Sequence, residues 1–223
     1  MTATRDLIPF GSDADVEKAL PTVVTYLQRG GVLAYPTETV YGFGGAPTPE
    51  AIDALARLKP RPAGKPYLLL VASLEMIAAL GMRLEGDAAR LAERHWPGAL
   101  TLVLPAENDQ ISGRLRGPEG GVAVRWTSHP GLARLLRAFG HPITSTSANA
   151  AGAPPALSAS ELAREWSAAM ARDALRVLDG GILAASPAST MVDCTGRHPR
   201  VIRPGAIASA TLRQTVPDLI GDV

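Results

Sequence analysis

The chain has 223 residues, enough for one large or two small domains and for a sizeable buried core. Hydrophobic residues make up 46% and aromatic residues only 4%, so aliphatic side chains must fill that core. The net charge of +1 lacks the basic excess that is typical of proteins wrapped in nucleic acid, although it is compatible with a local basic site.

The sequence also carries signals about the compartment. Cys194 is the only cysteine, so no internal disulfide can form, which suits a reducing environment. The first twenty residues have no apolar core of signal-peptide length, and no run of about eighteen apolar residues occurs anywhere. We therefore expect a cytoplasmic protein without a membrane span.

Helical and strand patterns alternate in the first half of the chain. Ser12 with Asp15 is typical of a helix start, and Gly30-Gly31 of its end. Thr48 is a second cap, followed by a proline in the first turn. In chain order, the pattern predicts a helix from Ser12, a strand at 32–35, a helix at 48–58, a proline-rich loop at 59–66, a strand at 67–72, a short helix capped by Ser73, a helix at 87–96 and a strand at 100–104.

The second half continues with more strands than helices. It predicts a strand at 122–126, a helix at 130–139, a strand at 143–147, a helix at 160–170, and strands at 175–178, 191–193 and 201–202. Because some strands follow one another directly, we expect an α/β fold with an open, twisted, mixed β-sheet and flanking helices.

Several common motifs are absent from the sequence. It has no G-x-G-x-x-G with a following helix start, no P-loop and no G-x-S-x-G nucleophile elbow. The four histidines are scattered, and none pairs with Cys194 at metal-ligand spacing. No metal site of the protein is therefore expected, and Cys194 is interpreted as a packing residue.

Two groups of small polar residues follow predicted strands. The first is PTETVYG, which begins at Pro36, and the second is STSAN, which begins at Ser145. Strand alternation would place Ser145, Ser147 and Asn149 on one face. Such clusters at strand ends suit a ligand cleft, but hydroxyls that satisfy nearby backbone groups would explain them equally well.

Cations form a second kind of signal. Lys59, Arg61 and Lys65 lie within seven residues on a loop that its prolines stiffen, which suits a polyphosphate or simply a solvated basic loop. Arg125 interrupts an apolar strand, so it is either ion-paired in the core or directed at an anion. Arg203 follows the late STMVD block and adds a further cation.

Taken in order, PTETVYG, K-x-R, STSAN-x-x-G-x-PP, ST-x-VD and RPGAI resemble the YrdC-like family of threonylcarbamoyl-AMP synthases. The matching blocks run from about residue 31 to 207. The resemblance implies a YrdC-like fold around a basic cleft. It also implies a single catalytic domain over residues 1–223, of the short bacterial type without an extra C-terminal domain.

The resemblance further implies roles for individual residues. The positions matching contacts to L-threonine are Thr37, Arg125, Ser145 and Ser189. The positions matching contacts to ATP are Lys59, Arg61, Lys65, Ser147, Asn149 and Arg203, with Lys59 and Arg61 also expected to be catalytic. Leu70 stands where some members have a histidine that touches threonine, and Glu38 is interpreted as making a structural hydrogen bond.

The reaction implied is ATP-dependent synthesis of L-threonylcarbamoyladenylate from L-threonine and bicarbonate, with Mg²⁺ accompanying ATP and pyrophosphate leaving. No tightly bound organic cofactor is expected. The product would serve formation of N6-threonylcarbamoyladenosine at position 37 of tRNA, through transient contact with the transferase machinery and weak binding of tRNA. The alternatives are a paralogue of the same fold with another acceptor, or a non-catalytic RNA-binding module, for which aromatic stacking residues are few.

Overall fold

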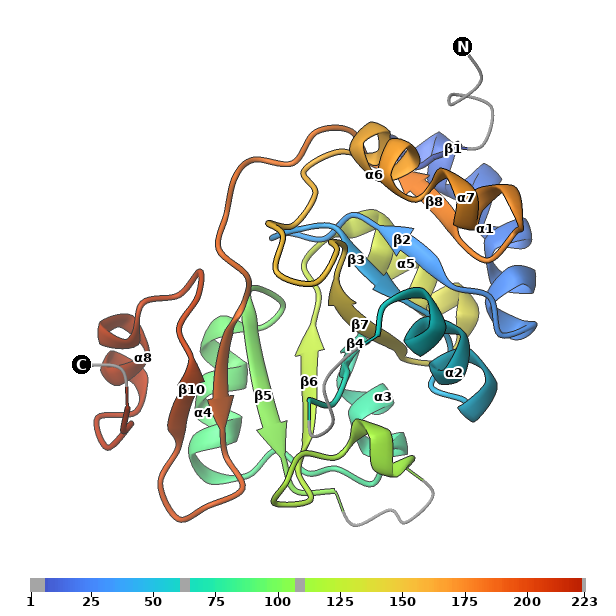
Figure 1. Cartoon of the computed structure of the whole chain (residues 1–223). Coiled ribbons are helices and arrows are strands. Elements are labelled where there is room, and N and C mark those ends of the chain that lie inside the picture. The colour runs from blue at the N-terminus through green and yellow to red at the C-terminus, as the bar shows by residue number, and fades with distance from the viewer. Residues whose placement is uncertain (1–6, 61–64, 107–110, 222–223) are drawn as a thin grey trace.

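The computed structural model describes residues 7–60, 65–106 and 111–221. Within these ranges, ten strands form one mixed sheet in the order β1-β8-β2-β3-β7-β4-β6-β5-β9-β10 (Figure 1). The strands are β1 (Leu7–Pro9), β2 (Leu33–Tyr35), β3 (Gly42–Gly44), β4 (Leu68–Val71), β5 (Leu100–Leu104), β6 (Val122–Trp126), β7 (Ile143–Ser147), β8 (Arg176–Asp179), β9 (Thr190–Asp193) and β10 (Arg200–Arg203). The expected open mixed sheet with flanking helices is confirmed.

The helices surround this sheet, and most begin at the residues that the sequence indicates. They are α1 (Asp13–Gln28), α2 (Pro49–Leu58), α3 (Leu74–Ala79), α4 (Gly86–His95), α5 (Pro130–Phe139), α6 (Ala159–Glu165), α7 (Ser167–Ala171) and α8 (Ser209–Thr215), with the 3₁₀ turn η1 at Gly113–Leu115. Ser12 and Asp15 cap α1 reciprocally, and the hydroxyls of Thr48 and Ser73 cap α2 and α3. None of the described helices has the length and hydropathy that a bilayer span requires.

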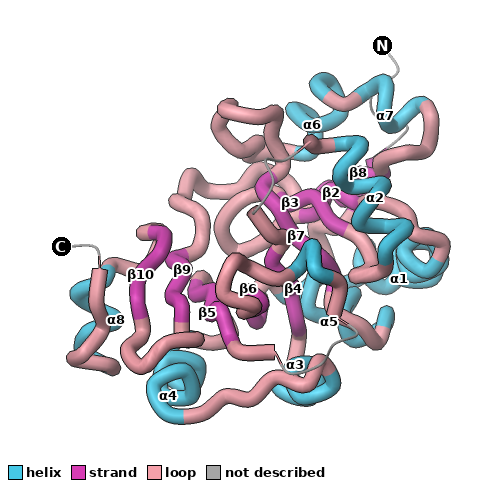
Figure 2. The backbone as a smooth tube through the Cα atoms, turned by 60° about the horizontal axis from the view of Figure 1, so that its bottom comes forward, coloured by secondary structure: helices cyan, strands magenta, loops and turns pink. Residues whose placement is uncertain are grey.

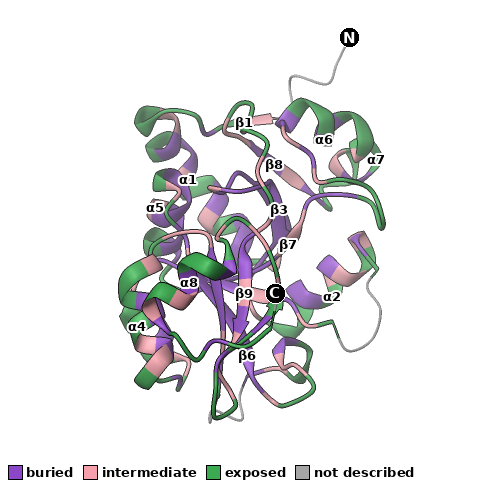
Figure 3. Ribbon diagram, turned by 90° about the vertical axis from the view of Figure 1, so that its left-hand side faces the viewer, coloured by how far each residue is buried: buried purple, intermediate pink, exposed green. Residues whose placement is uncertain are grey.

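Strand alternation divides the apolar residues between two cores. In β2, Leu33 and Tyr35 face α1 and α5, whereas Ala34, with Val32 just before the strand, belongs to the larger core that includes residues of α2, α4, α6 and α8. Figure 2 shows α1 and α5 beside one half of the sheet and α3 and α4 beside the other. Buried residues are concentrated along the strands and the inner faces of the helices (Figure 3).

Four differences from the sequence prediction have physical causes. β1 and β3 are only three residues long and carry a proline or glycines, so they form through pairing with distant strands rather than through local propensity. The predicted helix at 160–170 is interrupted at Trp166, whose ring packs edge-on against Phe43, so α6 and α7 are separate helices. α8, which lacks a clear apolar period, was not predicted.

A close approach of two strands explains one glycine of the sequence YGFGG. β3 lies antiparallel to β7, and a Cβ on Gly44 would overlap the carbonyl oxygen of Thr144. The hydroxyl of Tyr35 donates to the same carbonyl at 2.9 Å. Gly44 therefore lets β7 lie close enough to place its polar end at the centre of the sheet.

Candidate functional site

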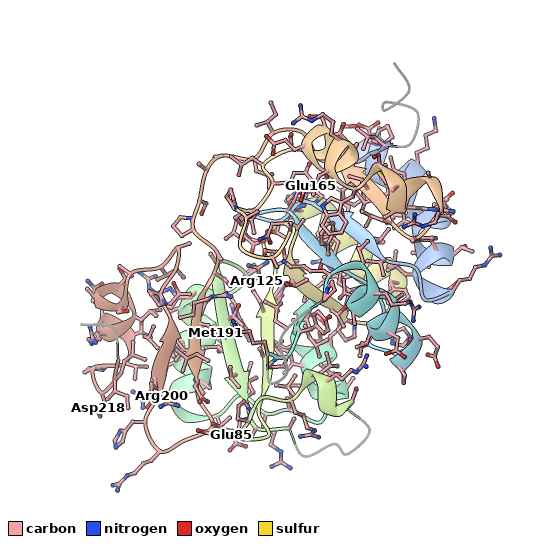
Figure 4. All side chains as sticks on the ribbon, in the orientation of Figure 1. Glu85, Arg125, Glu165, Met191, Arg200 and Asp218 are labelled. Atoms are coloured by element: carbon pink, nitrogen blue, oxygen red, sulfur yellow. The ribbon has the colours of Figure 1, made fainter. Side chains whose placement is uncertain are left out.

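A pocket of about 210 Å³ lies where the two halves of the sheet meet. Residues from six strands or their flanking loops contribute to it, so distant parts of the chain converge there. Figure 4 shows Arg125 and Met191 near the centre of the molecule, whereas Glu85, Arg200 and Asp218 are peripheral. The predicted site residues that line the pocket are Thr37, Arg125, Ser145, Ser147, Ser189 and Arg203.

The loop after β2 forms one wall through a network of threonine hydroxyls. The Thr37 hydroxyl donates to the carbonyl of Val40 at 2.7 Å and accepts from the amides of Thr39 and Val40. It therefore satisfies its own backbone, as the structural interpretation of this motif expected, while still lining the pocket. Thr39 joins the network, with its Oγ1 3.1 Å from that of Thr37.

Arg125 combines the two roles that the sequence left open, an ion pair in the core and a place at a ligand site. It lines the pocket, and its Nε lies 3.5 Å from Oε1 of Glu38 in a buried ion pair. Its Nη1 donates to Thr39 at 3.2 Å. Glu38 accepts at 2.7 Å from the hydroxyl of Thr127, which confirms its expected structural hydrogen bond. The Glu38 carboxylate thus holds Arg125 in position while the guanidinium lines the pocket.

A neighbouring histidine responds to this buried environment. Burial lowers the pKa of His129, although the nearby Glu38 carboxylate and a backbone hydrogen bond act in the opposite direction. Its Nδ1 accepts from the amide of Leu132 at 3.2 Å and so caps α5. An unprotonated Nδ1 is needed for this cap, which agrees with the lowered pKa.

The basic loop meets the STSAN block through Lys59. Its ammonium is buried and donates to the Ser147 carbonyl at 2.6 Å, to Oδ1 of Asn149 at 2.8 Å and to Oγ of Ser147 at 3.3 Å. Lys65 is exposed and precedes the pocket residue Pro66. Arg61 lies outside the described residues.

Asn149 acts mainly as a connector and is not among the residues that line the pocket. Its amide group donates to the carbonyls of Ala150 and Ala153, which holds the turn after β7, while its Oδ1 accepts from Lys59 and from the Ser147 hydroxyl. Of the three residues expected on one face of the strand, Ser145 and Ser147 line the pocket and Asn149 does not.

The two C-terminal motifs dock onto each other. Arg203 donates from Nη2 to the carbonyl and the hydroxyl of Ser189, at 2.8 and 3.1 Å. Thr190 exchanges hydrogen bonds with the backbone of Ile207, at 2.6 and 2.9 Å. The RPGAI segment therefore lies against the STMVD segment, which explains why both belong to one site.

Three polar residues that support the pocket were not among the predicted site residues. Thr39 and Thr127 hold the Arg125–Glu38 pair, and Thr101, fully buried on β5, lies 2.7 Å from Ser189 through the two hydroxyl oxygens. In the sequence, Thr101 could have been noticed as a polar residue within the otherwise apolar run LTLVL. Leu70, the position of the implied histidine, is fully buried in the core beside α1 and α5, while Leu68 lines the pocket.

The described residues contain no group of three or more histidine, cysteine, aspartate or glutamate side chains that could hold a metal ion. Burial, with the nearby Asp193 and Asp87, raises the pKa of Cys194 to about 12, so this thiol is a poor nucleophile. The polar side chains that line the pocket belong to arginines, serines and threonines. Such groups bind and orient anionic, hydroxyl-bearing molecules.

The fold and the pocket define a mixed α/β protein with a small, polar, cation-lined site at the centre of its sheet. Residues 25–205 match the Sua5/YciO/YrdC family model, which is described as "telomere recombination". The chain belongs to this family, which confirms the resemblance seen in the motifs.

Its relatives include several proteins called threonylcarbamoyl-AMP synthase. The one from Bacillus subtilis is 33% identical over 191 residues, covering 85% of this chain and 54% of the relative. The one from Thiobacillus denitrificans is 39% identical over 183 residues, covering 81% of this chain and 94% of the relative. The chain thus spans about half the length of the Bacillus subtilis and Pyrococcus abyssi relatives and nearly all of the Thiobacillus denitrificans one.

Solved structures of members of this family have the same fold. Sua5 of P. abyssi complexed with L-threonine superposes with a TM-score of 0.85 at 28% identity, covering 96% of this chain and 62% of that protein. YciO of E. coli shares the fold, with a TM-score of 0.80 at 23% identity, covering 92% of this chain and 97% of that protein.

Proposed function

We propose that the protein synthesises L-threonylcarbamoyladenylate from L-threonine, bicarbonate and ATP, with release of pyrophosphate. The observation that carries this proposal is the convergence of Thr37, Arg125, Ser145 and Ser189 on one pocket. The relatives called threonylcarbamoyl-AMP synthase and the threonine complex of a relative support it. Residues of both halves of the sheet build this pocket, so we also propose that the described ranges act as one catalytic domain.

In this proposal, Arg125 binds the carboxylate of threonine. Its guanidinium lines the pocket and is fixed by Glu38 and Thr39, so little reorganisation is needed when the substrate enters. Ser189, held between Thr101 and Arg203, and Ser145 supply hydroxyls to the amino acid. Thr37 contributes mainly by shaping the loop, because its hydroxyl is used by the backbone.

ATP lies against the cationic side of the pocket. Lys59, Arg61, Lys65 and Arg203 offset the negative charge that shifts onto pyrophosphate, and Ser147 contacts the nucleotide. Asn149, expected as a nucleotide contact, serves the site by holding Lys59 and Ser147 in position. Mg²⁺ accompanies ATP as part of the substrate and neutralises phosphate charge. Lys59, already held at the end of β7, has a fixed position relative to these groups.

The chemical step requires no covalent enzyme intermediate. The threonine amine captures carbon dioxide, or bicarbonate with loss of water, to give a carbamate. A carbamate oxygen forms a bond to the α-phosphorus of ATP, and the bond from that phosphorus to the bridging oxygen breaks as pyrophosphate leaves. Positioning and charge stabilisation supply the catalysis. We further propose that the product serves tRNA modification in the cytoplasm through a transferase partner.

Pyrophosphate release tests the proposal. Purified protein is assayed with ATP, Mg²⁺ and bicarbonate, with and without L-threonine, beside the Lys59→Ala and Arg61→Ala variants. We expect release that requires both threonine and bicarbonate and that falls sharply in the variants. Folded protein that binds ATP but shows no threonine-dependent release would refute the synthase assignment and favour another acceptor.

A further inference from the structure

The loop at residues 36–41, between β2 and β3, supplies three side chains to the proposed active site. Thr37, Thr39 and Val40 line the pocket. Because β2 pairs in parallel with β8, the chain leaves both strands at the same end of the sheet. The segment that follows β8 therefore begins next to this loop, although 140 residues separate Tyr41 from Gly181.

The segment after β8, residues 180–189, crosses from one half of the sheet to the other. β8 and β9 are far apart in the strand order, and Figure 1 shows a long loop connecting them. The last two residues of this crossing segment, Ala188 and Ser189, line the pocket. The position of the crossing segment therefore helps to define the shape of the site.

Both ends of the loop at residues 36–41 contact the beginning of the crossing segment. Pro36 packs closely on Gly180, where a Cβ would overlap the proline ring. At the other end, the hydroxyl of Tyr41 donates to the carbonyl of Gly181 at 2.8 Å and accepts from the amide of Gly180 at 3.1 Å. The two glycines are thus held between the first and last residues of the loop.

Tyr41 also connects the loop to the residues that follow β7. Its carbonyl accepts at 2.8 Å from the amide of Ala148, which is next to the pocket residue Ser147. The crossing segment reaches the same part of the chain, because the amide of Leu183 donates to the carbonyl of Leu157 at 2.8 Å. Tyr41 therefore bonds to two other segments that contribute residues to the pocket.

The side chain of Tyr41 is fully buried, and it is not among the described residues that line the pocket. Burial raises the pKa of Tyr41 to about 12, so the hydroxyl keeps its proton at neutral pH and remains a donor. Without this hydroxyl, the amide of Gly180 and the carbonyl of Gly181 would both lose a partner. An influence of Tyr41 on the reaction must therefore pass through the segments that it holds.

We propose that Tyr41 is a positioning residue of the threonine site, whose hydroxyl fixes the loop at residues 36–41 against the crossing segment. This inference rests on the proposed function, because it concerns the binding of threonine. A site whose loops are fixed before binding loses less free energy in ordering them. Loss of the hydroxyl should therefore weaken threonine binding more than it slows the chemical step.

Tyr41→Phe removes only the hydroxyl, and Tyr26→Phe is the matched control. The hydroxyl of Tyr26 also donates to a backbone carbonyl, that of Asp173, at 2.8 Å, but Tyr26 is on α1 and outside the pocket. In Tyr41→Phe, we expect the Kd and KM for threonine to rise about fivefold, while kcat stays within about twofold of the wild type. In Tyr26→Phe, all three constants should be unchanged, even where the two variants lose similar stability.

Gly180→Ala tests the same contact from the opposite side. The added Cβ would push the crossing segment away from Pro36 without altering Tyr41. The Kd for threonine should rise again, and the double variant with Tyr41→Phe should show less than the product of the single effects, because both changes act on one contact. Fully multiplicative effects would contradict a shared contact.

Amide hydrogen exchange tests the role of Tyr41 independently of activity. In Tyr41→Phe, the hydrogen-bonded amides of Thr39, Val40 and Gly180 should exchange faster than in the wild type, with no change in Tyr26→Phe. Unchanged exchange at these amides, or a threonine affinity equal to that of Tyr26→Phe, would overturn the proposal. A wild-type protein that neither binds threonine nor releases pyrophosphate would refute the synthase activity instead, and the exchange rates would then decide whether Tyr41 holds the loop.

Discussion

Replacing Lys59 with methionine should destabilise the protein before any ligand is added. The ammonium connects the end of α2 to the end of β7 through acceptors 2.6 and 2.8 Å away, on the Ser147 carbonyl and the Asn149 side chain. Methionine has a similar length but no donor, so both acceptors lose this partner in a buried region. Lys59 is therefore structural as well as a proposed phosphate ligand.

The size of the effect follows from these two bonds. A hydrogen bond from a charged donor contributes about 1.5–3 kcal/mol, and removing the buried ammonium returns part of this through relieved desolvation. The net loss in free energy of unfolding should be about 3 kcal/mol. For a chain of this size, each kcal/mol lowers Tm by about 2–4 °C, so a fall of about 6–12 °C is expected.

Differential scanning calorimetry of ligand-free protein measures this change directly. Lys65→Met is the matched control, because Lys65 is exposed and makes no hydrogen bond within the described ranges, so its Tm should move by no more than about 2 °C. Both variants should bind ATP more weakly. A Lys59→Met protein that melts with the wild type would refute the structural role and leave Lys59 as a ligand-binding residue only.

Three further substitutions test the surroundings of the pocket. Glu38→Gln removes the charge behind Arg125, so the free energy of unfolding in urea should fall by about 2 kcal/mol and the KM for threonine should rise; unchanged values of both would contradict this. Burial lowers the pKa of His129 below 6.5, so its contribution to stability is complete above pH 6.5 and is lost as the pH falls, because the unfolded state binds the proton more tightly. His129→Asn keeps a cap that does not titrate, and urea unfolding at pH 5 to 7.5 should show a smaller loss than in the wild type, whereas identical pH profiles would exclude the role. Gly44→Ala should lower Tm by at least about 5 °C through overlap with a β7 carbonyl, while Gly113→Ala, which meets nothing within 4 Å, should not.

Local signals in the sequence predicted most of the helices and the longer strands, although not α8 or the break between α6 and α7. Ser12, Thr48 and Ser73 all cap helices where the sequence indicated, because a cap depends on residues three positions apart. β3 could not be predicted in this way. Its sequence GFG has little strand propensity, and it forms because β2 and β7, far apart in the chain, pair with it on either side.

The same distinction applies to the pocket. Polar residues at strand ends indicated where ligands could bind, and many of them do line one cavity. The contacts that hold them were not predictable, since they join segments separated by many residues. Thr101 and Ser189 meet across β5 and β9, which no periodicity in either segment indicates.

These supporting contacts also bear on how the pocket could discriminate between substrates. Arg125 and Ser189 are each held by at least two protein groups before a ligand enters, so their positions are set by the fold. A preorganised site loses little free energy to rearrangement on binding, and it penalises a ligand whose polar groups lie elsewhere. A Thr101→Val change keeps the shape of the side chain but removes one partner of the Ser189 hydroxyl, which Arg203 still contacts. The ratio of kcat/KM for threonine to kcat/KM for its analogues should therefore fall, while the free energy of unfolding changes little.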